Sequence, residues 1–309
     1  MPVQFAPADV EAALDNRFVV GARIAVGGQG AVFRANRSSR PDGTAAEDIV
    51  ALKLHHYHTQ DIRAQREIAA MENISHPALA RLIENGSCDV AGRRTRYAAW
   101  EFIEGKTLGQ QLKVGRMEEP EVLSIGRDVS AAIAEIWSRR IVHGDIKPSN
   151  IMLRNSGGTV LIDLGAARYL EQDNSPAARE PFGTRGYLSP EQARATKGLS
   201  CASDVFSLGV VMLQALLGRH PTDYSQNVLS EGLRASETKL AASAPLLGEL
   251  DRMLSARPTA RPQPAELSLR FQRLYERMSL LYAMDPPSAS QSQANSIDGV
   301  SEEPWARSG

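Results

Sequence analysis

The residue types that could bind a phosphate group come first along the chain. Residues 25–32 read Ala-Val-Gly-Gly-Gln-Gly-Ala-Val, and glycines allow a hairpin to bring its backbone N–H groups close to an anion. Three glycines within four residues are, by themselves, more often a flexible turn. A dinucleotide-binding loop would be followed by a helix, whereas a strand-like run follows here.

Lys53 is a second candidate for contact with an anion. It lies near the end of the apolar run 49–54, and a buried lysine is costly unless an anion meets its ammonium group. Glu67, fourteen residues further on, is an available partner. The alternative is an ordinary strand-end lysine whose ammonium group reaches solvent.

The stretch 141–150 has a dense set of polar side chains between apolar flanks. It reads Ile-Val-His-Gly-Asp-Ile-Lys-Pro-Ser-Asn, so that an imidazole, an acid, a cation and an amide follow one another closely. Thirteen residues after Asn150, the apolar run 160–162 ends in Asp163-Leu164-Gly165. Either fragment alone is compatible with a loop that carries capping polar groups. Both together, in this order and at this spacing, are poorly explained in that way.

Strands must position the first two features. The first hundred residues are predicted to form about five strands and one helix. The strands are expected in the runs 18–24, 31–35, 49–54, 79–84 and 97–103, the helix at 61–73, a loop at 36–48 and a Gly/Arg-rich hairpin connection at 86–96.

Helices must position the third feature. Apolar residues at helical spacing predict long helices at 121–138, 204–217 and 264–282. Pro120 falls in the first turn of the first helix, and Gly218 is expected to end the second. Residues 285–309 contain six Ser, four acids and one Arg, which is typical of a disordered acidic tail.

The composition limits the class of protein without indicating its chemistry. The 309 residues hold 35 Lys+Arg against 36 Asp+Glu, a net charge of −1, which argues against a nucleic-acid partner bound by a general basic surface. No segment reaches the roughly 18 apolar residues of a membrane span, and the N-terminus does not have the pattern of a secretory signal. Cys88 and Cys201 are too few for a disulfide framework, so a reducing, cytoplasmic location is expected.

Taken together, the motifs resemble the eukaryotic-type (Hanks-type) Ser/Thr protein kinase family, including its bacterial members. The signature of that family is a Gly-rich loop, a strand lysine, a catalytic loop, an Asp-x-Gly motif and a Pro-Glu anchor. All occur here in that order, with the anchor at Pro190-Glu191, and the resemblance covers about residues 18–280. Further matching runs are His76-Pro77, 101–108, 183–189, 204–209 and Arg261-Pro262.

The resemblance implies an α+β, bilobal protein-kinase fold. A small N-lobe would hold a five-stranded antiparallel sheet and one main helix, and a larger C-lobe would be mostly α-helical. The expected division is an N-terminal extension at 1–17, an N-lobe at 18–103, a C-lobe at 104–284 and a disordered, Ser-rich acidic tail at 285–309.

The resemblance also implies transfer of the γ-phosphoryl group of ATP to Ser or Thr hydroxyls of protein substrates, and autophosphorylation. Asp145 would orient the substrate hydroxyl and accept its proton, while Lys147 would neutralise charge on the phosphoryl group in transfer. Lys53, held in place by Glu67, would contact the α/β-phosphates. Mg²⁺, with two ions expected, would be bound by the oxygen donors of Asn150 and Asp163.

The adenine and the phosphates of ATP would contact both lobes. Glu101 and Ile103 would offer backbone hydrogen bonds to adenine. Its ring would lie among Val32, Ala51 and Met152, which can equally be ordinary core residues. The phosphate loop would contain Ala25, Gly27 and Gly30.

Other motif residues have structural roles in the family that this chain resembles. Asp204 would anchor the catalytic loop, and Glu191 would pair with Arg261. His143, Leu164 and Met71 resemble the apolar column that links the lobes, Trp100 falls at the position behind adenine, and Thr184 favours a Ser/Thr over a Tyr kinase.

Three departures from the family pattern affect the interpretation. Ala25 stands for the first glycine of the phosphate loop, which concerns ATP affinity, and Leu164 stands for a phenylalanine. Gly144 stands for the arginine that usually precedes the catalytic aspartate and contacts a phosphate on the activation segment. We therefore hypothesise that activity does not depend on phosphorylation of residues 163–191.

Two other functions remain open at this point. A pseudokinase would use the same fold as a nucleotide-binding scaffold, although Lys53, Asp145, Asn150 and Asp163 are all retained. A small-molecule phosphotransferase would usually lack the Pro-Glu anchor. The sequence does not indicate the physiological substrate or the input signal. It suggests a regulatory partner protein. It is also compatible with export of the protein as an effector without a signal peptide.

Overall fold

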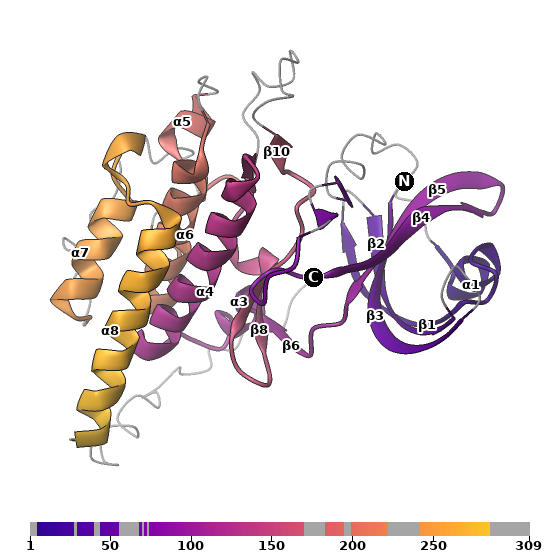
Figure 1. The fold of residues 1–309 in the computed structure, drawn as a ribbon, viewed down its shortest axis with the longest axis horizontal. Coiled ribbons are helices and arrows are strands. Elements are labelled where there is room, and N and C mark those ends of the chain that lie inside the picture. The colour runs from indigo at the N-terminus through magenta and orange to yellow at the C-terminus, as the bar shows by residue number, and fades with distance from the viewer. Residues whose placement is uncertain are drawn as a thin grey trace, which may run out of the picture.

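Two lobes of different secondary structure stand side by side in the computed structural model (Figure 1). A five-stranded antiparallel sheet forms one lobe, and helices dominate the other, so the predicted α+β, bilobal fold is confirmed. The structure describes residues 5–27, 30–39, 44–55, 68–69, 71–72, 74–169, 183–194, 199–221 and 242–284. The predicted tail at 285–309 lies outside these residues.

The N-lobe sheet has the strand order β1-β2-β3-β5-β4. Its strands are β1 (Phe18–Gly27), β2 (Gly30–Ser39), β3 (Ala45–His55), β4 (Leu82–Val90) and β5 (Arg93–Glu101). Because side chains alternate along a strand, Leu52 and Leu54 of β3 join an apolar cluster on one face while Lys53 lies on the other. A slip of one residue in the pairing of Val32 with Lys53 would exchange these faces.

The strands are longer than the apolar runs that predicted them. The predicted loop at 36–48 is strand at 36–39 and 45–48, where Arg37 pairs across the ladder with Asp48. The predicted connection at 86–96 shrinks to a turn at Ala91 and Gly92. Polar residues extend both hairpins because the backbone ladder satisfies their N–H and C=O groups whatever their side chains are. Of the predicted helix at 61–73, only 68–69 and 71–72 are described.

Residues 5–17 pack against the N-lobe sheet. Helix α1 (Pro7–Ala13) contacts β1 and β4, and Phe5, Val10 and Leu14 lie in the same apolar cluster as the buried residues of the sheet. Glu11 Oε1 accepts a hydrogen bond from the N–H of Val20 at 2.6 Å. The segment before the sheet therefore adds apolar surface to the core of the N-lobe.

A buried polar cluster also ties this segment to the sheet. Glu84 on β4 accepts hydrogen bonds from Arg17 at 2.6 Å, from Arg37 at 3.1 Å and from the Tyr97 hydroxyl at 2.8 Å. The side chains of Glu84 and Arg37 are only 5% and 6% exposed. Two guanidinium groups thus share one buried carboxylate, which compensates its desolvation.

The predicted long helices of the C-lobe are confirmed. They are α4 (Glu119–Ser138), α6 (Cys201–Leu217) and α8 (Pro264–Met284), accompanied by α3 (Leu108–Gln111), α5 (Pro190–Ala193) and α7 (Ala244–Met253). Helix α4 packs against both α6 and α8. Pro120 lies in the first turn of α4, and Gly218, with a φ of +72°, ends α6 as expected.

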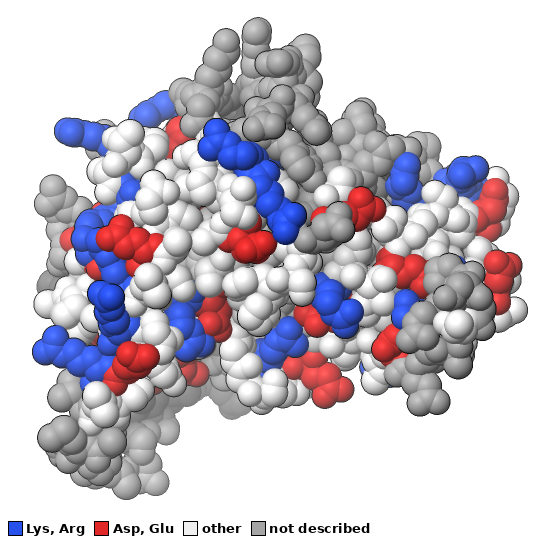
Figure 2. All heavy atoms as spheres, in the orientation of Figure 1, with Lys and Arg blue, Asp and Glu red and all other residues white. Residues whose placement is uncertain are grey.

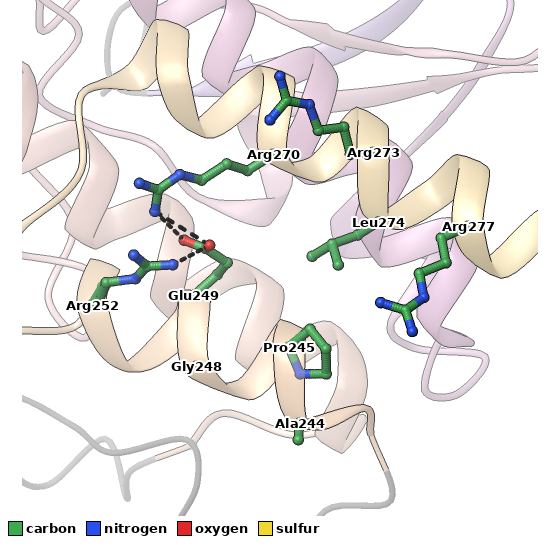
Figure 3. Close-up of a pocket in the computed structure, with 9 residues that line it drawn as sticks. All are labelled: Ala244, Pro245, Gly248, Glu249, Arg252, Arg270, Arg273, Leu274 and Arg277. Carbon is green, nitrogen blue, oxygen red and sulfur yellow. Dashed lines mark hydrogen bonds and ion pairs between the residues drawn. The ribbon is translucent and has the colours of Figure 1, made fainter.

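Helices α7 and α8 form the edge of the C-lobe farthest from the sheet (Figure 1). Figure 2 shows Lys and Arg side chains gathered over this edge, at the left of the view, with acidic groups among them. An open groove of about 630 Å³ lies between the two helices (Figure 3). Of the helices that the structure describes, none is long and apolar enough for a membrane span.

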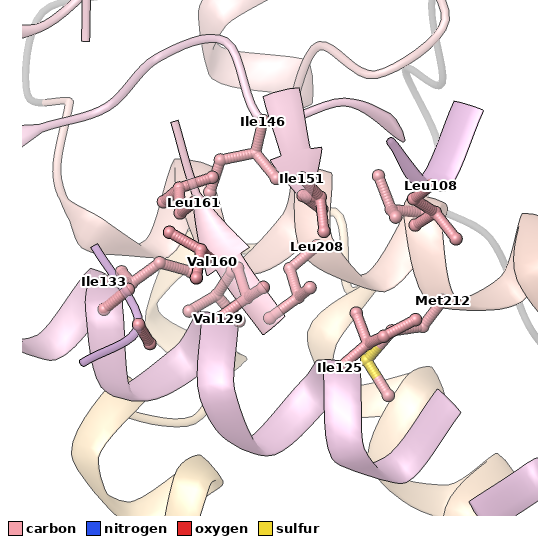
Figure 4. Packing of buried hydrophobic residues seen from close by; sticks show 14 of the residues in the cluster. Leu108, Ile125, Val129, Ile133, Ile146, Ile151, Val160, Leu161, Leu208 and Met212 are labelled. Atoms are coloured by element: carbon pink, nitrogen blue, oxygen red, sulfur yellow. The ribbon is translucent and has the colours of Figure 1, made fainter. Parts of the chain in front are cut away.

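The short strands β6 to β10 belong to two small sheets next to the helical core of the C-lobe. The sheet β6-β8-β9 consists of β6 (Gly105–Thr107), β8 (Ile151–Arg154) and β9 (Thr159–Leu161), and β7 (Ile141–Val142) pairs with β10 (Arg168–Tyr169). Figure 4 shows Val160 and Leu161 packed against Val129 and Ile133 of α4. The polar stretch at 141–150 therefore runs between strands that are fixed to the core.

Candidate active site

Asp145, Lys147 and Thr184 each contact the other two through polar side-chain atoms. Lys147 Nζ donates to Asp145 Oδ2 at 2.7 Å and to Thr184 Oγ1 at 2.9 Å, and Thr184 Oγ1 donates to Asp145 Oδ1 at 2.6 Å. The side chains of Asp145 and Lys147 are 16% and 25% exposed. Asp145 Oδ2 also has a long contact with Asn150 Nδ2, at 3.4 Å, whereas Thr184 is the one side-chain donor to Oδ1 among the described residues. Oδ1 can accept a second hydrogen bond, so Asp145 can receive another hydroxyl beside a fixed cation.

Asp204 holds the loop that carries Asp145. Its Oδ2 accepts from the N–H of His143 and its Oδ1 from the N–H of Gly144, both at 2.8 Å. Burial raises the pKa of Asp204, and the two N–H donors and His143 oppose this rise. The predicted anchoring role of Asp204 is confirmed, and it fixes the loop to the buried helix α6.

Asn150 is oriented by the same loop. Its Nδ2 donates to the backbone oxygen of Asp145 at 2.9 Å, and the side chain is buried. Because Nδ2 is used in this way, Oδ1 is the atom that remains as an acceptor, and its contact with the Ser149 hydroxyl is long, at 3.4 Å. Asn150 can therefore present a neutral oxygen to a cation.

Lys53 meets an anion from the other lobe. Its Nζ lies 3.1 Å from Asp163 Oδ1, and the two residues are 110 positions apart in the chain. The Lys53 side chain is 10% exposed, so the prediction of a buried lysine that meets an anion is confirmed. Glu67, the partner expected from the sequence, lies outside the described residues.

The backbone of Asp163 adopts a conformation that L residues rarely use, with a φ of +63°. Such strain is found mainly at functional sites. Burial tends to raise the pKa of Asp163, but Lys53 and the N–H of Gly165 outweigh it, so the pKa is lowered. Both donors contact Oδ1. Among the described residues, no donor reaches Oδ2, which leaves this oxygen available to a cation.

The residues expected around adenine lie along the junction of the lobes. Ala51 and Met152 pack against the larger apolar cluster, and Trp100, which pairs with Ala51 on the adjacent strand, is buried in that cluster. The N–H of Glu101 donates to Arg81 O at 2.9 Å, so a backbone contact from Glu101 to a ligand would come from its carbonyl oxygen. Val32 is partly buried and Ile103 is buried.

The glycine-rich segment is a hairpin between β1 and β2. Gly27 pairs with Gly30, and Ala25 pairs with Val32 directly after a shift in the strand register between Arg23 and Ala25. The ladder therefore accommodates alanine at this position. A Cβ atom on Gly30 would collide with the carbonyl group of Leu54. The packing of β2 on β3 therefore requires a glycine at position 30, independently of any ligand. The tip at 28–29 lies outside the described residues.

The segment after Gly183 is fixed to the C-lobe. Glu191 accepts two hydrogen bonds from Arg261, at 2.6 and 2.9 Å, as predicted. Burial tends to raise the pKa of Glu191, but the Arg261 guanidinium outweighs it and the pKa is lowered. This ion pair joins α5 to the segment before α8.

A second contact of this segment was missed by the sequence interpretation. Gln192 Nε2 donates to the carbonyl oxygen of Gly144 at 3.0 Å, while its Oε1 accepts from Ser189 N at 3.1 Å. Gly144 has a φ of +78°, and a Cβ atom on Gly183 would lie 2.6 Å from Gly144 O. The spacing of Ser189 and Gln192 is a capping-box pattern that could have predicted the local turn but not the contact with Gly144.

Comparison with known families identifies the arrangement. A profile described as "Protein kinase domain" matches residues 18–284. The chain belongs to the protein kinase family.

Three bacterial protein kinases are among the curated relatives of this kinase domain. The Ser/Thr protein kinase pkn2 of Myxococcus xanthus is 31% identical over 268 residues, which are 82% of this chain and 31% of the relative. The Ser/Thr protein kinase PknA of a Nostoc strain is 30% identical over 268 residues, 82% of this chain and 46% of the relative. The Ser/Thr protein kinase PknB of Mycobacterium leprae is 29% identical over 210 residues, 67% of this chain and 33% of the relative. The kinase domain thus spans less than half the length of these relatives.

The donors in this kinase domain suit a divalent cation that is shared with a phosphate ligand. Asn150 Oδ1 and Asp163 Oδ2 are the available oxygens, and Mg²⁺ commonly takes its remaining ligands from phosphates and water. Within the described part of the chain, no three His, Cys, Asp or Glu residues gather as a metal cage. The residues therefore fit Mg²⁺ that arrives with a nucleotide.

The cysteines of the kinase domain are buried and unpaired. Burial raises the pKa of Cys88 to about 11 and that of Cys201 to about 12, so neither is a nucleophile at neutral pH. His56 and His58, which follow His55 in the sequence, lie outside the described residues.

Proposed function

We propose that the chain transfers the γ-phosphoryl group of ATP to Ser and Thr hydroxyls of protein substrates. The observation that carries this proposal is the set of mutual contacts among Asp145, Lys147 and Thr184, with the Lys53–Asp163 pair at the junction of the lobes. Membership of the kinase family and the names of the bacterial relatives support it.

In this proposal, Asp145 orients the acceptor hydroxyl and takes its proton. The hydroxyl oxygen forms a bond to the γ-phosphorus, the bond from that phosphorus to the β,γ-bridging oxygen breaks, and ADP leaves. Lys147 lies 2.7 Å from Asp145 and neutralises charge on the transferred group. The Thr184 hydroxyl, which already contacts Asp145 Oδ1, supports the view that this carboxylate accepts from an aliphatic hydroxyl.

ATP is proposed to lie between the lobes. Lys53, with Glu67 as a second partner, would contact its α/β-phosphates, and the hairpin with Ala25, Gly27 and Gly30 would cover them. The proposed contacts of adenine are the backbone of Glu101 and Ile103 and the side chains of Val32, Ala51 and Met152. Mg²⁺, with two ions expected, would be held by Asn150 and Asp163 and would lower the charge on the phosphates.

Gly144 supports a further part of the proposal, namely activity without phosphorylation of the activation segment. The position that usually carries a phosphate-binding arginine is a glycine with a positive φ, and Gln192 contacts its carbonyl oxygen directly. This hydrogen bond offers a link between the segment and the catalytic loop that needs no phosphate. Ser175 lies in the activation segment, outside the described residues, and we expect the Ser175→Ala protein to remain active. If Ser175→Ala abolished activity and an acidic residue at position 175 restored it, this part of the proposal would be wrong.

We also propose a cytoplasmic signalling role in which a partner protein supplies the input. Two buried, unpaired cysteines suit a reducing compartment. A search for bound proteins after affinity purification, with and without crosslinking, would test the partner.

The direct test of activity uses the purified full chain with Mg²⁺ and γ-labelled ATP. We expect label on Ser and Thr of the chain itself and of casein, as read by phosphoamino-acid analysis, and none with Asp145→Asn. A chain that binds ATP but transfers no label would be a nucleotide-binding scaffold instead. Label on small acceptors but never on protein would indicate a small-molecule phosphotransferase.

A further inference from the structure

The groove between α7 and α8 is strongly basic. Its lining contains four arginines, Arg252, Arg270, Arg273 and Arg277, and one acid, Glu249, so its formal charge is +3 (4 − 1). Glu249 is paired with Arg252 and with Arg270, the latter at 3.2 Å, and Arg270 is also paired with Glu266 at 2.6 Å. Arg273 and Arg277 are exposed and make no ion pair with any other residue of the described ranges. The groove therefore holds positive charge that its own acid does not balance.

The floor of the groove is apolar. Figure 3 shows Leu274 and Arg277 directed from α8 toward α7, where Pro245 and Gly248 lie. A Cβ atom on Gly248 would meet nothing within 4 Å, so the glycine leaves space open above α7. An aromatic side chain next to acidic groups would match both the floor and the rim.

The sequence beyond α8 has this pattern. Residues 285–309 carry four acids and one Arg, a net charge of −3 (1 − 4), and the run 301–305 reads Ser-Glu-Glu-Pro-Trp. Residues 270–284 occupy about 21 Å of helix at 1.5 Å per residue. The 17 residues from 285 to 301 can span about 56 Å when extended, which is enough to return along α8 to the groove.

We propose that residues 301–305 of the same chain dock in the α7–α8 groove. Glu302 and Glu303 pair with Arg277 and Arg273, and Trp305 packs against Leu274 and Pro245. The net charges of the groove lining and of the tail are opposite in sign. The groove lies on the far side of α4 from the sheet, so docking leaves the proposed active site open (Figure 1). The proposal does not depend on kinase activity.

Disulfide trapping in the full chain tests the proposal. Ser301→Cys is combined either with Gly248→Cys in the groove or with Leu280→Cys, a side chain that is 66% exposed on the last turns of α8. Cys88 and Cys201 do not compete, because burial raises their pKa values to about 11 and about 12. A tail without a docking site would reach position 280 sooner, since the loop to be closed is shorter.

We expect position 248 to crosslink within one chain about tenfold faster than position 280, because docking raises the local concentration of position 301 at the groove. Arg277→Glu should remove this preference, and Glu302→Lys added to Arg277→Glu should restore it. Arg94→Glu, on the exposed β4–β5 hairpin, is the matched control and should change nothing.

Three results would overturn the proposal: equal or faster crosslinking at position 280, a crosslink indifferent to the charge at 277, or disulfide-linked dimers, which would place a second chain in the groove. The melting temperature of each variant distinguishes a misfolded protein from a folded protein whose tail no longer docks. Absent kinase activity in a chain that still docks its tail would refute only the proposed function.

Discussion

Two clusters of polar side chains, one around Glu84 and one around Asp145, differ in how much solvent reaches them. In the N-lobe, Glu84 and Arg37 are 5% and 6% exposed. In the loop proposed to be catalytic, Asp145 and Lys147 are 16% and 25% exposed. Both clusters join a carboxylate to cations at hydrogen-bond distance.

The difference in exposure suggests that the Glu84 cluster stabilises the fold and that the Asp145 cluster takes part in the reaction. Almost no solvent reaches the Glu84 cluster, so loss of Glu84 would leave Arg37 with only Asp48 and Arg17 with only Tyr97 as side-chain hydrogen-bond partners among the described residues. The Asp145 cluster is open enough for a substrate hydroxyl to join it, and its members are held from outside by Asp204 and Asn150. We therefore expect substitutions in the first cluster to change stability and those in the second to change turnover.

Asp145→Asn should have the largest effect on activity. Loss of the proposed proton acceptor is expected to lower kcat about 10²–10⁴-fold, because that is the usual contribution of general acid–base catalysis. The melting temperature should stay close to that of the parent, since Asn keeps the shape of the side chain. Steady-state kinetics and thermal unfolding measure the two quantities. Asp89→Asn, on the exposed edge of β4, is the matched control; a comparable loss there would break the comparison.

Glu84→Ala should have the largest effect on stability. Two guanidinium groups would lose their shared carboxylate, at a cost of about 3–5 kcal/mol in the free energy of unfolding. Urea denaturation measures this cost, and kcat of the folded fraction should change less than about twofold. Glu135→Ala, which removes a more exposed pair with Arg139, should cost under about 1 kcal/mol. A Glu84→Ala protein of parental stability but low kcat would reverse the roles of the clusters.

Acid should weaken the anchor between Glu191 and Arg261. The pKa of Glu191 is lowered in the folded protein, so its contribution to stability is complete above the unfolded pKa of about 4.3 and is lost as the pH falls through the lowered value. The difference in unfolding free energy between the parent and Glu191→Gln, measured by urea denaturation, should therefore shrink between pH 6 and pH 3. A difference that stays constant over this range would contradict the assignment.

Gly144→Ala should have the smallest effect. A residue with a Cβ atom at a φ of +78° costs about 1–2 kcal/mol. The strain falls on the catalytic loop, so we expect a modest loss of stability together with a lower kcat, measured on the same preparation. Gly115→Ala is the control, because a Cβ atom there meets nothing within 4 Å. An unchanged kcat would show that the loop tolerates movement at this point.

Local sequence patterns were enough to predict the family and the main helices of this protein. The order and spacing of the motifs indicated the kinase family, and the apolar spacing predicted α4, α6 and α8, because helix formation depends on residues three and four apart. The pairing of Glu191 with Arg261 followed from the family pattern and not from distance in the chain.

Only the tertiary structure decided which distant groups meet. The contacts of Lys53 with Asp163, of Glu84 with Arg17 and of Gln192 with Gly144 join residues 110, 67 and 48 positions apart. No periodicity in the sequence reports such contacts, because they depend on how finished elements pack. The groove between α7 and α8 also depends on the tertiary structure. Its arginines can be read from the sequence, but its shape results from the packing of the two helices.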